Sequence, residues 1–495
     1  MSAIPRFSYL ERPSIRENLQ DGIYDVAVIG GGITGAGVAR DAALRGLKVA
    51  LVEANDFASG TSSGSTKLLH GGLRYLEMFD FKLVFDAIQE REKLKTLYAP
   101  FVKELDFVFP TYAGLPPPRW KLNLGLHLYD SFSFFRERHQ NLNSSEAKAA
   151  FPYLKASGLT GACVYSDSFA EDYRLVIELV KSAHQYGATC ISRMRATQVQ
   201  RTANSDLLKI TLHDEFEQGK TVSLQCRSVI HCGGPFADEL RQKMGLRKIL
   251  KLTQGVHFLI SKSRLPIDKA FVFADPALHR ILFAIPWNST FYIGTTDSSI
   301  ARAEDARATP GDLDYVLRIV NNYFSIQLKP SDVIQSWAAV RPLLQPDEQV
   351  SNSQISREHV ILEEPERVFH VLGGKLTSHR LMAEEAVDLL KKYFPKMGDS
   401  TTSKAPLYPN LHSQVLPEDF AEKVRFSLDY EMVLNPIDFM RRRSALYYES
   451  PTLETAEKIS AIFRQTHEQH SQAPLQTDIE ATKASLQWDQ KGFVA

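Results

Sequence analysis

The sequence contains no continuous apolar run of about 18 residues, the length that a helix needs to cross a bilayer. Its first 20 residues, MSAIPRFSYLERPSIRENLQ, lack the apolar core of a secretory signal peptide. It also lacks an excess of charge, because 58 Lys and Arg residues balance 58 Asp and Glu residues. We therefore expect no membrane-spanning helix and no binding of nucleic acid through overall charge, so any anion site must be local.

Cysteine is scarce, and its spacing argues against a structural zinc site. The four cysteines contain no C-x-x-C pair, which favours reduced thiols in a cytoplasmic compartment. We therefore predict no metal site and expect each cysteine to be a small buried hydrophobic residue. They are Cys163, Cys190, Cys226 and Cys232.

What the sequence does contain is a strand–glycine–helix unit near its start. Residues 24–29 (YDVAVI) are apolar and rich in β-branched side chains, as in a buried parallel strand. A glycine turn, a helical segment at 36–46 and a second strand at 47–52 follow, and Glu53 closes the second strand. This order predicts a βαβ unit of the Rossmann type.

The glycine turn has the spacing G-x-G-x-x-G, which in this context is typical of dinucleotide binding. The first glycine permits the turn, the second admits a pyrophosphate, and the third lets helix and strand pack closely. The helix N-terminus offers N–H groups to the pyrophosphate, while Glu53 would bind ribose hydroxyls and repel a 2′-phosphate, which favours FAD or NAD over NADP. The predicted contacts in the turn are Gly30, Gly32, Ile33, Thr34 and Gly35.

The stretch GTSSGSTKLLHGGLRYLE, residues 60–77, is poor material for the interior of a helix or strand. It is either an exposed loop or a binding site for an anion. Its position shortly after Glu53 resembles flavoproteins of the D-amino-acid-oxidase-like class, in which this loop follows the FAD pyrophosphate towards the flavin ring. The resemblance favours FAD over NAD and implies cofactor contacts from Thr61, Ser62, Ser65, Thr66, Lys67 and His70.

Two later segments repeat the pattern of a strand followed by a glycine pair, at 229–234 and 366–374. A long helix is predicted from Lys375 through Tyr393, and its N-terminus would stabilise the negative charge of a reduced flavin. Between these segments, alternating apolar residues predict antiparallel strands, including a hairpin at 280–297. Further predicted cofactor contacts are Ala196, Gly233, Gly234, Gly374, Leu376 and Thr377.

This order of elements predicts an α/β + α fold, with a discontinuous Rossmann-like FAD-binding domain, an antiparallel-sheet substrate-binding domain and a C-terminal helical domain. The FAD-binding domain is assigned to residues 22–98, 150–250 and 341–396. The substrate-binding domain is assigned to residues 99–149 and 251–340, and the helical domain to residues 397–495.

Four separate motifs carry a more specific resemblance: STKLLHGGLRYLE, IPW with FYIGTTD, AAVRPL and LGGKLTSHR. In this order they resemble the FAD-dependent glycerol-3-phosphate dehydrogenases. The resemblance implies oxidation of sn-glycerol 3-phosphate to dihydroxyacetone phosphate by hydride transfer to non-covalent FAD. Electrons would pass to ubiquinone or menaquinone from a protein bound peripherally to the cytoplasmic face of the inner membrane, as a monomer or a homodimer.

Two positions depart from that family. HCGGPF at 231–236 stands where Asn-Ala-Thr-Gly-Pro-Trp is usual, and His379 stands where tyrosine is common. Related oxidases, which reduce oxygen to hydrogen peroxide, usually carry an additional internal segment for which this chain has no room. An oxygen-dependent glycerol-3-phosphate oxidase is the alternative function. An amino-acid oxidase fits less well, because grouped cations suit a phosphate dianion better than a zwitterion.

The implied reaction needs a base for the hydroxyl proton and cations for the phosphate. Histidine suits the base because its pKa lies near the working pH. The resemblance places His70 and His257 in the active site without deciding which one is the base. The expected phosphate anchors and hydroxyl contacts are Arg74, Arg341, Lys375, Tyr75 and Thr377.

Two features leave the membrane contact open. Residues 120–138 (WKLNLGLHLYDSFSFFRER) suit an interfacial helix, although a helix packed within the substrate domain is the favoured interpretation. The cluster Arg441-Arg442-Arg443 fits lipid head groups, a quinone path or simple exposure to water.

Overall fold

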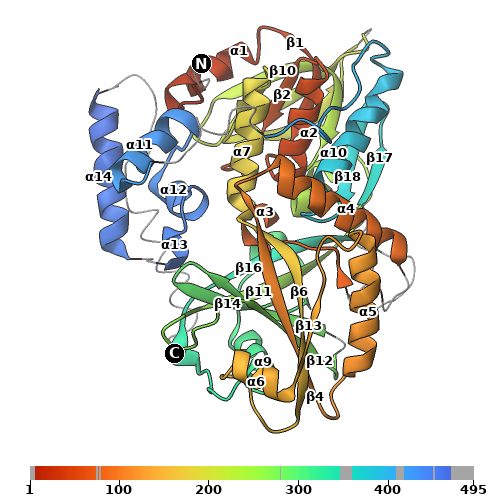
Figure 1. Ribbon diagram of the computed structural model, residues 1–495. Coiled ribbons are helices and arrows are strands. Elements are labelled where there is room, and N and C mark those ends of the chain that lie inside the picture. The colour runs from red at the N-terminus through yellow and green to blue at the C-terminus, as the bar shows by residue number, and fades with distance from the viewer. Residues whose placement is uncertain are drawn as a thin grey trace.

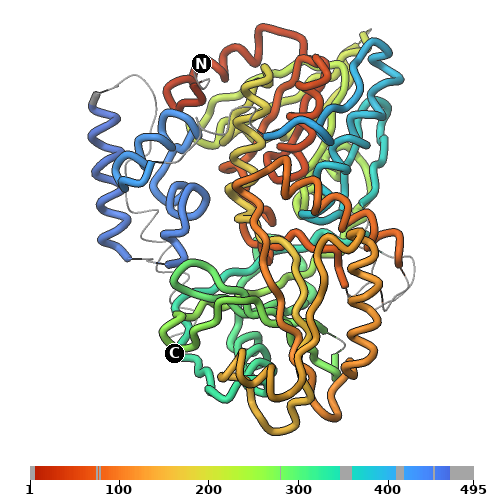
Figure 2. Tube along the Cα trace, viewed as in Figure 1, coloured from red at the N-terminus to blue at the C-terminus, as the bar shows by residue number. Residues whose placement is uncertain are grey.

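The computed structural model describes residues 6–73, 76, 80–203, 205–278, 280–345, 359–407, 417–449 and 452–469. Two sheets form the body of the molecule, one above the other in Figure 1, and the C-terminal helices pack beside the upper part. Figure 2 shows that the N-terminal segment and the segment coloured cyan to light blue meet in the upper part. Within the described residues, no helix combines the length and apolar character needed to cross a membrane.

The first sheet is built around parallel strands. Strand β1 (Ile23–Ile29) pairs in parallel with β2 (Val49–Val52) on one side and β10 (Thr221–His231) on the other. Both faces of these strands are covered, which explains their continuous apolar runs. The remaining strands of this sheet are β7 (Thr189–Ile191), β8 (Met194–Arg201), β9 (Leu208–Asp214), β17 (His359–Glu363) and β18 (Val368–Gly373).

Three helices pack against one another beside this sheet (Figure 1). They are α2 (Ile33–Leu44), α7 (Asp172–Gln185) and α10 (His379–Asp388), with α2 between the other two. Helix α7 begins after Glu171 and ends before Tyr186. The short helices of this part are α1 (Arg12–Asn18), α3 (Thr61–Gly64) and α8 (Ala237–Lys243).

The second sheet is largely antiparallel and curls around its own hydrophobic core, so the prediction of an antiparallel sheet is confirmed. The predicted hairpin is also confirmed, because β13 and β14 pair antiparallel across Asn288-Ser289. The strands are β3 (Leu68–Leu69), β4 (Val102–Tyr112), β5 (Gln140–Asn143), β6 (Leu159–Ala170), β11 (Leu250–Ser261), β12 (Ala270–Asp275), β13 (Arg280–Trp287), β14 (Thr290–Gly294), β15 (Ser298–Ser299) and β16 (Val333–Leu344).

Four helices border the second sheet. Helices α6 (Ser144–Ala150) and α9 (Pro310–Val320) supply residues to the core of the curl. Helices α4 (Phe81–Leu97) and α5 (Arg119–Phe132) pack against each other, and they contact β4 and β6 respectively. The helix predicted within residues 120–138 is therefore confirmed, although it ends at Phe132.

The C-terminal helices are α11 (Phe420–Tyr430), α12 (Pro436–Arg442), α13 (Leu446–Glu449) and α14 (Leu453–Gln469). Buried ion pairs fasten them to the first sheet, because Arg442 and Arg443 both bind Asp56, which follows β2, at 2.7 Å and 3.0 Å. Burial alone would raise the pKa of Asp56, but Arg443 and Arg442 lower it to about 2. These two arginines thus dock the helices, and neither lies free in water.

Two sequence predictions about boundaries differ from the structure. Helix α10 begins at His379 rather than at Lys375, because Gly373 and Gly374 both have positive φ and a turn precedes the helix. Lys375 is therefore not at a helix N-terminus. Strand β6 lies in the segment assigned to the FAD-binding domain, yet it belongs to the second sheet, because it pairs antiparallel with β4 along almost its full length.

Candidate active site

A first cavity of about 460 Å³ lies at the carboxyl ends of β1, β2, β10 and β18. In open parallel sheets this edge is where ligands bind. The predicted cofactor contacts that line it are Gly30, Gly32, Ile33, Thr34, Glu53, Thr61, Ser62, Ser65, Ala196, Gly233, Gly234, Gly374 and Leu376. Segments far apart in the sequence therefore converge on one cavity.

The glycine turn is held in a form that admits no side chain at two of its positions. Gly30 has φ +108°, and a Cβ there would lie 2.4 Å from the backbone oxygen of Cys232. A Cβ on Gly35 would lie 1.8 Å from the backbone oxygen of Gly30. Gly35 does not line the cavity; it fixes the approach of α2 to β1, which is the packing role expected of the third glycine.

Glu53 lines the first cavity. Its Oε2 accepts a hydrogen bond from the Gly31 N–H at 2.6 Å, and its Oε1 accepts one from the Asn55 N–H at 2.7 Å. Burial raises the pKa of Glu53, although these backbone donors oppose the shift. The carboxyl group is thus fixed in place and offers acceptor oxygens at the position expected for ribose hydroxyls.

The Gly-Thr-Ser-Ser stretch forms helix α3 and one wall of the first cavity. Ser62 Oγ accepts a hydrogen bond from the Ile33 N–H at 2.9 Å, which ties α3 to the start of α2. Thr61 Oγ1 donates to the Val340 carbonyl at 2.6 Å, which ties it to β16. Two consecutive side chains at the start of α3 therefore anchor the stretch to α2 and β16, and the interpretation as an exposed loop is wrong.

Lys67 lies outside both cavities, contrary to its assignment as a cofactor contact. Its ammonium group is fully buried, 2.6 Å from Asp172 Oδ1, and donates to the Ser63 carbonyl at 3.1 Å. A buried ammonium group needs a carboxylate nearby, and here helix α7 supplies it. Four aromatic rings also surround the group: Tyr173, Trp287, Trp337 and Tyr448.

The segment after β18 has two roles. Lys375 lines the first cavity together with Gly374 and Leu376, and it does not line the second cavity described below. Thr377 is buried and lines neither; its Oγ1 accepts from the His70 N–H at 3.1 Å and lies 3.3 Å from the His70 carbonyl. Thr377 therefore holds the backbone of His70 in place instead of contacting a ligand.

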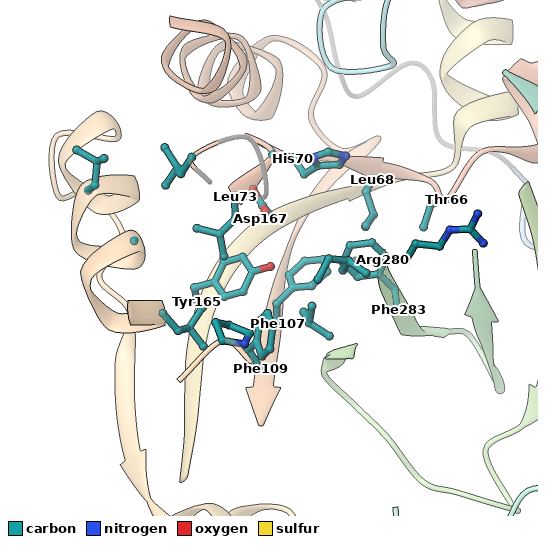
Figure 3. Close-up of a pocket in the computed structure, with 18 of the residues that line it drawn as sticks. Thr66, Leu68, His70, Leu73, Phe107, Phe109, Tyr165, Asp167, Arg280 and Phe283 are labelled. Carbon is teal, nitrogen blue, oxygen red and sulfur yellow. The ribbon is translucent and has the colours of Figure 1, made fainter. Parts of the chain in front are cut away.

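A second cavity of about 870 Å³ adjoins the first. Neighbouring residues in the chain divide the two spaces: Ser65 lines the first and Thr66 the second, while Pro342 lines the first and Arg341 the second. Figure 3 shows His70 and Thr66 above the rings that line the opposite wall. Those rings belong to Phe107, Phe109, Tyr165 and Phe283.

The two candidate histidines occupy different environments. His70 lines the second cavity and is half-buried. His257 is buried, its Nε2 lies 3.0 Å from Thr66 Oγ1, and its ring stacks on Trp337 at 4.9 Å. Burial and the nearby charges of Arg341 and Lys67 hold the pKa of His257 well below its usual range, so its ring is neutral. Only His70 of this pair reaches the cavity directly.

Two arginines line the second cavity, and both form hydrogen bonds with Asp297. Arg341 Nη2 donates to Thr295 Oγ1 at 3.0 Å, and its Nη1 donates to the Thr296 carbonyl at 3.2 Å. Arg280 Nη2 donates to the Asp297 carbonyl at 2.9 Å. The strand ends of β13, β14 and β16 thus bring two guanidinium groups to one place. Arg74 and Tyr75, which were also expected here, lie outside the described residues.

Sequence reasoning missed Arg280 and several backbone contributors. Arg280 is the first residue of the apolar strand RILFAIPW. A positively charged residue at the start of an apolar strand could have indicated an anion site. Cys232 and Pro342 line the first cavity. Cys232 directly follows β10, whose end could have been compared with the glycine turn, whereas Pro342 lies within β16. The four cysteines are buried and unpaired, as predicted.

Comparison with protein families gives one match that covers most of the chain. The model described as "FAD dependent oxidoreductase" matches residues 25–389. An aerobic glycerol-3-phosphate dehydrogenase of Staphylococcus haemolyticus is 38% identical over 392 residues, which cover 78% of this chain and 70% of that protein. One from Staphylococcus aureus is 36% identical, with 79% and 71% covered.

Two solved structures share the fold, one of them over nearly the whole length of this chain. The glycerol-3-phosphate dehydrogenase from Bacillus halodurans complexed with FAD superposes with a TM-score of 0.78 at 26% identity, covering 98% of each chain. The L-alpha-glycerophosphate oxidase from Mycoplasma pneumoniae with FAD bound has a TM-score of 0.61 at 18% identity, covering 80% of this chain and all of that one. The latter supports the fold alone.

Proposed function

Because the chain belongs to the family of FAD dependent oxidoreductases and uses FAD as its cofactor, we propose that it oxidises sn-glycerol 3-phosphate to dihydroxyacetone phosphate. The observation that carries the proposal is the junction of the two cavities. Thr66 follows Ser65 and Arg341 precedes Pro342, so each lies next to a residue of the first cavity. His70 lines the second cavity together with Thr66 and Arg341. A base and a cation thus stand next to the cofactor site.

The residues of the first cavity fit FAD. Gly32, Ile33 and Thr34 at the start of α2 would hold the pyrophosphate, because a helix N-terminus favours an anion. Glu53 would accept from ribose hydroxyls, and Lys375 would lie beside the flavin ring. When bound, FAD supplies the acceptor for the two electrons and the hydrogen that leave the alcohol carbon.

Arg341 and Arg280 are proposed to bind the substrate phosphate. Both guanidinium groups are already oriented by Thr295, Thr296 and Asp297, so little side-chain freedom is lost when an anion binds. Arginine offers paired N–H donors that match phosphate oxygens. Anchoring the phosphate there would align the neighbouring secondary alcohol with the wall that separates the two cavities.

His70 is proposed as the base that takes the hydroxyl proton. It lines the cavity, and the hydrogen bonds between its backbone and Thr377 fix its position. His257 is proposed to act as a positioning residue, because its ring is neutral and reaches the cavity only through Thr66. Thr66 Oγ1 would thereby be oriented for a hydrogen bond to the substrate.

The electron acceptor is proposed to be ubiquinone or menaquinone, reached at the cytoplasmic face of the inner membrane. An exposed apolar group supports this: Trp120 and Leu124 on α5, with Phe134 and Phe135 just beyond it. Aromatic and aliphatic side chains of this kind suit the membrane interface. Oxygen is the alternative electron acceptor, because a glycerophosphate oxidase has a related fold.

The test is an anaerobic titration of the purified flavoprotein. Adding sn-glycerol 3-phosphate should bleach the flavin absorbance, while glycerol and D-amino acids at equal concentration should leave it unchanged. Absence of bleaching with the phosphorylated substrate would refute the proposal. In a second step, a soluble quinone should restore the absorbance without oxygen. Stoichiometric hydrogen peroxide in air, with no effect of quinone, would assign the oxidase activity instead.

A further inference from the structure

A cluster of metal-binding side chains lies at the α5 wall of the second cavity, which His127 lines, and none of its members is proposed for catalysis. His127 and Asp130 are on helix α5, and His139 lies just before strand β5. One ligand atom from each residue lies within 4.8 Å of the others. This part of the chain carries no cysteine pair, so the cysteine spacing used to search the sequence could not reveal it.

Asp130 is a buried carboxylate whose charge is balanced by imidazole alone. Its side chain is 7% exposed, and its Oδ2 lies 2.7 Å from His139 Nδ1 and 3.3 Å from the His139 backbone nitrogen. In the part of the chain that the structure describes, no lysine or arginine forms an ion pair with Asp130. A carboxylate removed from water needs a cation or strong donors close by.

His139 is held as metal-ligating histidines usually are. Its Nε2 lies 2.6 Å from Asn123 Oδ1, and Asn141 Nδ2 donates to that same oxygen at 2.5 Å. With its oxygen oriented in this way, Asn123 accepts the Nε2–H. Nδ1 donates its hydrogen to the Asp130 carboxylate, and a bound ion would take the place of that hydrogen. Such a hydrogen bond from the outer ring nitrogen to a carbonyl oxygen fixes the tautomer and orientation of a metal ligand.

His127 completes three potential ligands and leaves one side open. It precedes Asp130 by three residues on α5, so both side chains lie on the same face of the helix. Its ring centroid lies 4.6 Å from that of His139, with the planes at 80°. Because His127 is exposed, a water molecule could occupy a fourth position.

We propose that His127, Asp130 and His139 bind a divalent transition-metal ion, with Zn²⁺ as the type. Two imidazoles and one carboxylate suit zinc, whereas Ca²⁺ and Mg²⁺ prefer oxygen ligands alone. Tetrahedral zinc ligands lie roughly 3.3 Å apart, so the ion would widen the 2.7 Å contact between His139 and Asp130 by a few tenths of an ångström.

The bound ion would cross-link α5 to the segment that leads into β5. Helix α5 lines the second cavity through Lys121, Leu122, Gly125 and Leu128, so the ion would fix one wall of that cavity. The inference does not depend on the identity of the substrate or the electron acceptor, because none of the three ligands has a role in the proposed reaction.

The test uses the full-length, tag-free flavoprotein after treatment with a chelator. Zn²⁺ should bind with a stoichiometry of one in calorimetry and raise the midpoint of thermal unfolding. Co²⁺ should give visible d–d absorption that Zn²⁺ displaces. His127→Ala, which changes an exposed side chain, should weaken Zn²⁺ binding by about 100-fold or more while folding normally. His213→Ala, at an exposed histidine on β9, should leave binding unchanged.

Two results would overturn the inference. One is equal Zn²⁺ affinity in His127→Ala, His213→Ala and the unaltered protein, which would mean that the ion binds elsewhere. The other is no Zn²⁺ binding by the unaltered protein at micromolar concentrations, which would leave the cluster as a hydrogen-bonded pair beside an exposed histidine. Asp130→Asn provides a second variant, and loss of the Co²⁺ spectrum in a folded Asp130→Asn protein would support the assignment.

Discussion

The two neighbouring cavities are bounded by different parts of the chain. Backbone and small side chains form much of the first, with Gly30 and Gly35 leaving no room for a Cβ. Large side chains from strands far apart in the sequence form much of the second, which is nearly twice as large. One methyl group in the wrong place should therefore destroy the first cavity. The second should tolerate such a change and depend on a few charged groups.

The largest expected effect is that of Gly35→Ala. The new Cβ would lie 1.8 Å from the Gly30 carbonyl oxygen, and neither backbone segment can move without separating α2 from β1. We expect loss of bound FAD and a fall of about 3 kcal/mol in the free energy of unfolding. Flavin content after purification and urea unfolding measure the two quantities.

Gly125→Ala is the matched control, because it also places alanine in a helix. A Cβ on Gly125 meets nothing within 4 Å, so the variant should keep its FAD and gain about 0.5–1 kcal/mol in stability. If Gly35→Ala retained full flavin content, the close packing of the turn would not be what forms the first cavity.

The next largest effect should separate the two histidines. His70→Asn removes the proposed base and should lower kcat by about 10²- to 10⁴-fold. His257→Asn should lower kcat less, because His257 reaches the second cavity only through Thr66. Single-turnover reduction of the flavin measures both effects on the chemical step. A larger loss in His257→Asn than in His70→Asn would reverse the proposed roles.

Short motifs predicted many of the residues that line the first cavity, because backbone and small side chains form much of its wall. The G-x-G-x-x-G turn, Glu53 and the glycine pairs after β10 and β18 are local signals, and each lies where the carboxyl end of a parallel strand must place it. The antiparallel sheet was likewise visible as alternating apolar residues. These features can be predicted without knowledge of contacts between residues that are distant in the sequence.

Side-chain partners could not be predicted in the same way. Lys67 belongs to a motif that follows the cofactor loop, yet Asp172 draws its ammonium group into the interior. Arg442 and Arg443 were expected to meet lipid head groups, a quinone path or water, but both form ion pairs with Asp56. In each case a carboxylate more than 100 residues away decides where the cation lies. Only the folded chain brings such pairs together.

The third expected effect compares Arg341, a cation that lines the second cavity, with Lys375, a cation that lines the first. Arg341→Ala should raise KM for sn-glycerol 3-phosphate by about 10- to 100-fold, since a hydrogen bond to a charged group contributes about 1.5–3 kcal/mol. Its FAD content should not change. Lys375→Ala should instead lower FAD content, because Lys375 lines the first cavity. Steady-state kinetics and flavin content measure the two responses.

The exposed Arg201 provides the control for that pair. It forms ion pairs with Asp206 and Glu366 at the surface, so Arg201→Ala should leave both KM and FAD content unchanged. The opposite outcome is a Lys375→Ala variant that keeps its full flavin content and raises KM as much as Arg341→Ala does. That result would show that Lys375 binds the substrate phosphate, as expected from the sequence.

The smallest expected effect concerns Glu53 in the first cavity. Burial raises its pKa in the folded chain above the unfolded value, so ionisation opposes folding. The stability of the FAD-free protein should therefore fall as the pH rises through the folded pKa. Glu53→Gln should flatten this fall in the unfolding midpoint while weakening FAD binding, and the exposed control Glu366→Gln should change neither. A wild-type profile as flat as that of Glu53→Gln would mean that the backbone donors of Gly31 and Asn55 fully offset the burial of this carboxylate.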